Sequence, residues 1–171
     1  RWPAGDCVGV ADMTIPVTIR LQQADFDIAR EIAALSRGRT DIGAVVSFSG
    51  ICRRDQAGGE GGDAIAALTL EHYPGMAEAE IARHVEEAVA RWPLTGVTVI
   101  HRFGRIVPGE NIVLVVTAST HREAAFQGAE FLMDYLKTRA PFWKREEGAS
   151  GSAWVDAYDR DDDAAARWTK S

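Results

Sequence analysis

Four basic side chains and no acidic one lie within nine consecutive residues of an otherwise acidic chain. They are Lys137, Arg139, Lys144 and Arg145. A lysine amine held among other cations and beside apolar surface can accept a proton or act as a nucleophile. The stiff or bulky run Pro141-Phe142-Trp143 could form a semi-apolar wall that holds Lys137 and Lys144 in this way. Taken alone, the stretch favours a simpler interpretation, because solvated basic residues collect at helix C-termini, where the helix dipole favours positive charge.

A second polar pair, His121 and Arg122, follows a predicted strand and opens a predicted helix. Free backbone N–H groups and the helix dipole favour a bound anion at a helix N-terminus, so this pair is a candidate anion site. The local sequence is equally consistent with a plain helix start, in which Thr120 caps the helix and His121 is an exposed residue of the first turn.

His121 and Lys137 lie at opposite ends of one predicted helix. At about 1.5 Å per residue they are roughly 24 Å apart, too far to line one small pocket of a single chain. The chain therefore has two separate sites, or it forms a two-fold dimer in which the neighbour contributes His121 and Arg122. We favour the dimer.

The remaining chemically active residue types give weaker signals. Arg53 and Arg54 follow a predicted strand, and their guanidinium groups either bind a phosphate or carboxylate or are simply solvated. Cys52 has no neighbouring histidine in the sequence, which argues against a nucleophilic thiolate. No histidine or cysteine pair has the spacing of metal ligands, so we expect no metal site.

Hydrophobic periodicity predicts the elements that position these residues. Alternating or continuous apolar runs between turn residues predict strands at 17–21, 43–50, 64–73, 97–103 and 111–119 and a short one near Trp154. The two strands at 97–103 and 111–119, joined through Pro108-Gly109, should pair antiparallel.

Apolar residues at helical spacing predict three main helices and a tail helix. The first is capped by Asp25 and ends at Gly38, the second covers 81–92 before Pro93, the third runs from about His121 until Pro141, and the tail helix starts at Asp161. The order βαββαββαβ implies an α+β domain with a mainly antiparallel sheet. The glycine-rich stretch within 53–63 lacks a phosphate-binding motif, which favours a flexible hairpin tip.

Composition limits the class of protein. The 171 residues are 46% hydrophobic and 26% charged, which predicts one ordinary globular domain over 13–171, preceded by a leader or expression-derived segment at 1–12. The net charge of −6 argues against general binding to nucleic acid or to anionic membranes. Without a membrane-length apolar run or a secretory signal, the expected location is cytoplasmic.

Seven segments, in this order, resemble one known family, the MoaE family of molybdopterin synthase large subunits. They are Gly-Ala-Val-Val-Ser-Phe-Ser-Gly at 43–50 with Arg53, Leu-Glu-His-Tyr-Pro-Gly-Met at 70–76, Arg-Trp-Pro-Leu at 91–94, Val-Ile-His-Arg at 99–102, Pro-Gly-Glu at 108–110, His121-Arg122, and Met-Asp-Tyr-Leu-Lys-Thr-Arg-Ala-Pro-Phe-Trp-Lys-Arg-Glu at 133–146. The resemblance extends over about residues 43–157.

The resemblance implies a fold of the α/β-hammerhead type and a heterotetramer, in which a homodimer of large subunits carries one small ubiquitin-like subunit at each end. It implies transfer of two sulfurs from thiocarboxylated small subunits to cyclic pyranopterin monophosphate, with neither metal nor cofactor. Lys137 and Lys144 match the family's active-site lysines. The substrate-binding segments match Ile51, Cys52, Arg53, His121, Arg122, Arg145 and Glu146. The loop after Arg53 is longer than the family pattern, and Tyr158 stands where some members have arginine.

Two other functions compete with this interpretation. The chain could be a dimeric binding platform that accepts the extended tail of a ubiquitin-like protein in a basic cleft without catalysis. A phosphate-ester enzyme ranks last, because the sequence shows neither paired carboxylates for metals nor a nucleophile–base pair.

Overall fold

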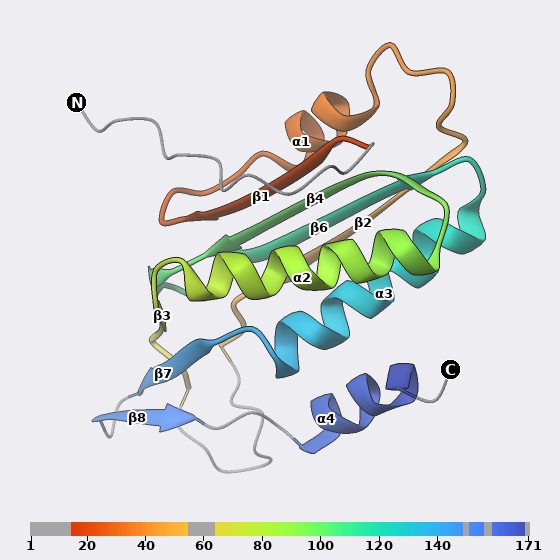
Figure 1. The fold of residues 1–171 in the computed structure, drawn as a ribbon. Coiled ribbons are helices and arrows are strands. Elements are labelled where there is room, and N and C mark those ends of the chain that lie inside the picture. Colours follow the sequence, from red (N-terminus) through yellow and green to blue (C-terminus); the bar gives the residue numbers. More distant parts are fainter. Residues whose placement is uncertain (1–14, 55–63, 149–150, 156–158, 170–171) are drawn as a thin grey trace.

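The computed structural model describes residues 15–54, 64–148, 151–155 and 159–169, which form two four-stranded sheets and four α-helices (Figure 1). The expectations for the N-terminal segment 1–12, for the glycine-rich loop and for Tyr158 fall mainly or wholly on residues outside these ranges. Among the described helices, none is long and apolar enough to cross a bilayer.

The first sheet holds the largest core. Its strands lie in the order β1 (Val17–Gln22), β4 (Leu94–Arg102), β6 (Asn111–Ser119) and β2 (Ala44–Ile51). The predicted antiparallel pairing of the 97–103 and 111–119 segments is confirmed in the β4–β6 ladder. Only β1 and β4 pair in parallel among the described strands, so the expected mainly antiparallel character is also confirmed.

Helices cover both faces of this sheet because its strands are apolar on both sides. α1 (Ile28–Ser36) packs on the face that carries Ile100 and Leu114, whereas α2 (Met76–Arg91) and α3 (Arg122–Thr138) pack on the face that carries Val99 and Val115 (Figure 1). Gly128 lets α3 approach β4 closely, since a Cβ there would lie 3.0 Å from the side chain of Leu94. α4 (Asp159–Ala166), followed by a short 3₁₀ turn at Arg167–Thr169, packs against α3.

The second sheet is smaller and entirely antiparallel. Its strands lie in the order β5 (Gly104–Ile106), β3 (Ala67–His72), β7 (Phe142–Gly148) and β8 (Gly151–Val155). β8 confirms the predicted strand near Trp154. β5 and β7 were not predicted, because β5 has only three residues and β7 contains four consecutive charged residues, which hide any apolar alternation.

Three helix starts differ from prediction. α2 begins at Met76, five residues before the predicted apolar face that starts at Ile81. Asp27, not Asp25, caps α1, and its side chain accepts a hydrogen bond from the backbone N–H of Arg30 at 3.0 Å. Asp25 instead accepts hydrogen bonds from its neighbour Phe26 and from Asn111, a residue far away in the sequence. The tail helix α4 begins at Asp159, two residues before the predicted start.

Candidate active site

Lys144 lies on β7 between two side chains that anchor it. Side chains at alternate positions of a strand project from the same face, so Phe142, Lys144 and Glu146 share one face of β7. Glu146 is 6% exposed, and its carboxylate lies 2.8 Å from the Lys144 ammonium, whose side chain is 33% exposed. The half-buried lysine is therefore held in a defined direction by a buried anion.

A buried apolar side chain lies beside Lys144. Its ladder partner on β3 is Leu70. Leu70 belongs to a small buried cluster of the second sheet. The members of this cluster are Cys52, Leu68, Leu70 and Ile106. An ammonium beside such surface is partly shielded from water, which strengthens its interaction with an anion.

The Lys144 charge acts on the Cys52 thiol, but the thiol is not activated. Burial raises the pKa of the Cys52 thiol; the Lys144 charge opposes this rise, whereas Glu110 and Glu146 add to it. The backbone N–H of Cys52 donates to the carbonyl of Glu110 at 2.9 Å, and its carbonyl accepts from the N–H of Gly109 at 2.8 Å. The residue therefore shapes the site through packing, and the sequence argument against a nucleophilic Cys52 agrees with its environment.

Lys137 lies in the last turn of α3 with an exposed side chain. The backbone N–H groups of Arg139 and Ala140 both donate to the carbonyl of Tyr135, at 2.7 and 3.2 Å, and so turn the chain away from the helix axis. Only residues 139–141 separate α3 from β7. The two lysines therefore lie on the elements that flank one tight connection.

The predicted semi-apolar wall is only partly correct. Phe142 is directed inward, where its ring stacks on that of His101 with centroids 3.9 Å apart and planes inclined by 14°. Trp143 is 52% exposed, because adjacent residues of a strand project to opposite faces. Only one of the two aromatic rings thus supports the lysine-bearing strand from within.

His121 and Arg122 lie at the opposite end of α3, as predicted, and both are exposed. His121 is the N-cap residue, and its side chain makes no capping hydrogen bond. The alternative in which Thr120 caps the helix is wrong, since the Thr120 hydroxyl donates to the carbonyl of Asp41 at 3.1 Å. Within one chain, the structure does not bring this pair to the lysines.

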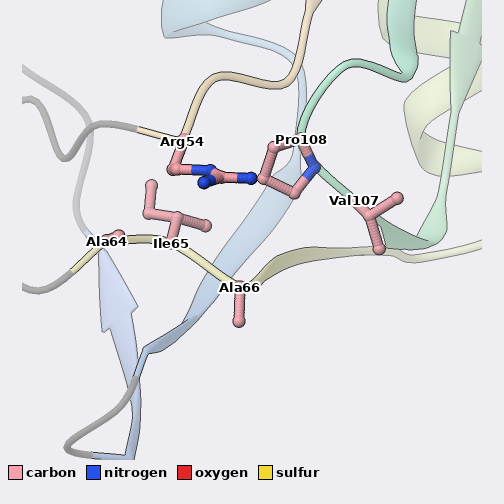
Figure 2. A pocket seen from close by; sticks show the side chains of 6 residues that line it. All are labelled: Arg54, Ala64, Ile65, Ala66, Val107 and Pro108. Carbon is pink, nitrogen blue, oxygen red and sulfur yellow. The ribbon is translucent and has the colours of Figure 1, made fainter.

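Ile51, Arg53 and Arg54 are exposed at the end of β2, on either side of the buried Cys52. Arg54 borders an open pocket of about 450 Å³, together with segments 64–66 and 107–108. Figure 2 shows the Arg54 side chain reaching toward Pro108 across this pocket. Arg53 is not among the residues that line it.

Arg145 is half-buried on the face of β7 opposite Lys144, and its guanidinium carbon lies 5.8 Å from the Trp154 ring centroid. In the described part of the chain, no group of three or more His, Cys, Asp or Glu side chains is placed to hold a metal ion. The sequence patterns did not reveal the contact of His101 with β7. A histidine followed by an arginine inside an apolar strand was the available signal, because buried polar residues need specific partners.

Comparison with known proteins gives a consistent picture. The family model described as MoaE protein matches residues 21–139. The chain is 64% identical over 156 residues to the molybdopterin synthase catalytic subunit of Mesorhizobium japonicum, which covers 90% of this chain and 94% of that protein. Among solved structures, the molybdopterin biosynthesis MoaE protein of Burkholderia ambifaria has a TM-score of 0.75 and 46% identity, over 91% of this chain and 99% of the other. Molybdopterin synthase from Staphylococcus aureus has a TM-score of 0.68 and 25% identity, over 85% and 98%.

Proposed function

The chain belongs to the MoaE family of molybdopterin synthase catalytic subunits, and we propose that it transfers sulfur from the thiocarboxylated C-terminus of a small ubiquitin-like subunit to cyclic pyranopterin monophosphate. It is thus a sulfurtransferase of molybdenum cofactor biosynthesis. A chain of this kind needs a second subunit as its sulfur donor, which agrees with the words "catalytic subunit" in the names of its relatives. We propose that it acts in the cytoplasm.

The observation that carries the proposal is the oriented, half-buried Lys144 beside the connection that leads from Lys137. Both reactants are anionic, since the carrier presents a thiocarboxylate and the acceptor a phosphate. Two lysines on one tight corner can bind these anions and move protons between them. The lysine pair therefore suits a reaction between two anions.

Each transfer replaces a carbon–oxygen bond of the pterin with a carbon–sulfur bond and breaks the acyl carbon–sulfur bond of the carrier. Hydrolysis of the acyl group turns the carrier C-terminus into a carboxylate, and the oxygen displaced from the pterin leaves as water or remains on the phosphate that was esterified there. Two transfers therefore consume two carriers. Lys137 is the main catalytic residue, and it either donates a proton or forms a transient bond to a carbonyl. Lys144, oriented by Glu146, positions the thiocarboxylate and transfers protons.

The anion-binding residues of each site come from two copies of the chain. His121 and Arg122 are exposed at the uncapped start of α3, roughly 24 Å from Lys137 along the helix. In a two-fold dimer the start of one α3 can face the end of the other, which brings phosphate-binding and sulfur-transfer groups together. Such a homodimer is the core of the proposed heterotetramer.

Reconstitution tests this function. The purified chain is mixed with thiocarboxylated small subunit and cyclic pyranopterin monophosphate, and dithiolene product is measured for the wild type and for Lys137→Ala. Product from the wild type and almost none from the variant, with carrier binding retained, is the expected result. If the wild type binds the carrier but makes no product, the chain is a binding platform and the proposal fails.

A further inference from the structure

The beginning of β7 rests on a ring from the other sheet. Phe142 is the first residue of β7, and it stacks on His101 near the end of β4 with centroids 3.9 Å apart. β4 belongs to the first sheet and β7 to the second, so this stack joins the two sheets. In Figure 1, β7 follows directly from the end of α3.

Two further rings complete the junction. His72, the last residue of β3, is the ladder partner of Phe142, and its ring centroid lies 6.0 Å from that of Phe142 and 4.5 Å from that of Phe103. β3 thus positions Phe142 from one side while His101 contacts its face. The result is a small aromatic cluster of His72, His101, Phe103 and Phe142 immediately before Lys144.

His101 is fixed in one orientation and one protonation state. Its Nδ1 lies 2.8 Å from the carbonyl oxygen of Arg102, and because that oxygen can only accept, Nδ1 carries the proton. Burial lowers the pKa of His101 to about 4; the hydrogen bond with the Arg102 carbonyl opposes this shift, and His72 adds to it slightly. The ring is therefore neutral near neutral pH. A flat, neutral imidazole can stack on Phe142 without a buried charge.

We infer that His101 is a positioning residue for Lys144: its ring sets the place of Phe142, and the strand then sets the place of the lysine two residues later. The step is short, since two residues of a strand span roughly 6.6 Å and project from the same face. Phe142 anchors this face before Lys144 and Glu146 anchors it after Lys144. The effect on sulfur transfer rests on the proposed function, whereas the effect on the place of Lys144 does not.

Two substitutions separate the ring from its hydrogen bond. His101→Phe keeps an aromatic ring against Phe142 and removes the Nδ1 donor. His101→Asn keeps an N–H donor for the Arg102 carbonyl and removes the ring. If the stack positions Lys144, phenylalanine at position 101 will keep Lys144 in place, whereas asparagine will not.

The place of Lys144 can be measured without any activity assay. The chain has three lysines, Lys137, Lys144 and Lys170, so reductive ¹³C-methylation of the full chain gives a simple NMR spectrum in which Lys144→Arg identifies the Lys144 signal. We expect the Lys144 signal to stay in place in His101→Phe and to shift in His101→Asn, with the Lys137 signal as the internal reference. An unshifted Lys144 signal in folded His101→Asn overturns the inference.

Kinetics with the reconstituted complex provide the second measurement. In His101→Asn we expect kcat to fall roughly ten- to a hundredfold, as for a catalytic group displaced by about 1 Å, with KM for the carrier unchanged. His101→Phe should stay close to the wild type. Equal losses in both variants, in step with their thermal unfolding midpoints, would mean that His101 is an ordinary core residue.

Phe142→Leu removes the same stack from the other side and covers the case in which His101→Asn does not fold. Since His101 acts through Phe142, Phe142→Leu should shift the Lys144 signal, and the double variant His101→Phe/Phe142→Leu should match Phe142→Leu alone. Additive effects of the two substitutions overturn the inference. A wild type that makes no product refutes the proposed function, and the NMR result still decides the role of His101.

Discussion

The two ends of α3 both carry basic side chains, but the surroundings of these side chains differ. At the C-terminal end, Asp134 accepts hydrogen bonds from the side chain of Arg167 and from Trp168 Nε1, which ties the last turns to the C-terminal segment. The chain then enters β7, where Glu146 orients Lys144. At the N-terminal end, His121 and Arg122 are exposed.

This difference separates two tasks. A group that moves protons needs a defined direction, and the chain supplies it through a buried carboxylate and a strand anchored between two sheets. A group that attracts an anion can remain mobile until the anion or a second copy of the chain orders it. We therefore expect the C-terminal end to govern the rate and the N-terminal end to govern assembly and substrate affinity.

The largest expected effect is that of the lysines. Lys137→Ala and Lys144→Ala should each lower product formation at least about a hundredfold, as expected for loss of a group that transfers protons. Because Lys137 is exposed, its substitution should leave the unfolding free energy within about 0.5 kcal/mol of the wild type. Arg105→Ala, which removes an exposed cation from the same sheet, is the matched control and should retain activity. Comparable losses in the control would mean that only net charge matters.

Acid should loosen the junction that supports β7. The folded pKa of His101, about 4, lies below its ordinary value of 6.5, so its contribution to stability is complete above pH 6.5 and is lost as the pH falls toward 4. The shift corresponds to up to about 3 kcal/mol. Burial also lowers the pKa of His84, so the wild type must be compared with His101→Phe in urea unfolding from pH 7.5 to 4.5. Parallel curves for the two proteins would contradict this prediction.

Glu146→Gln should have an intermediate effect. The substitution keeps the size of the side chain but leaves the Lys144 ammonium without its buried carboxylate, which should cost about 1–3 kcal/mol of unfolding free energy and lower kcat. The adjacent Glu147→Gln is the control. Glu147 pairs with exposed Arg105 at 3.3 Å, and such surface pairs contribute at most about 1 kcal/mol. Equal costs at the two positions would remove the distinction between a buried and a surface pair.

The smallest expected effect tests whether two copies share a site. Arg122→Ala and Lys137→Ala chains are each weakly active alone, but random mixing of the two should restore about a quarter of wild-type activity, because half of the dimers then hold one intact site of two. The measurement is product formation after the two variants are unfolded and refolded together. No recovery beyond the sum of the separate activities would place both residues in one chain's site or in two separate sites.

Features of the site that depend on local interactions could be predicted from the sequence, whereas those that depend on contacts between distant residues could not. The helix that separates His121 from Lys137 could be predicted because its apolar residues recur every three to four positions and because Pro141 limits its end. The cap of α1 could not be assigned correctly. Asp25 and Asp27 are both suitable caps by type, and only the contact of Asp25 with Asn111 distinguishes them.

Local patterns were enough to predict the helices, all four strands of the first sheet, β3 and β8 of the second, and the order of the motifs that identify the family, because burial periodicity and turn residues act over short stretches of chain. Long-range contacts were needed to show that Phe142–Gly148 is a strand, that Glu146 faces Lys144 and that His101 lies against Phe142. The β7 segment is too highly charged to show a strand pattern of its own. Its conformation comes from pairing with β3 and β8. Its anchor is His101, some forty positions earlier in the chain. Contacts between residues so far apart leave no local sequence pattern from which the strand could be predicted.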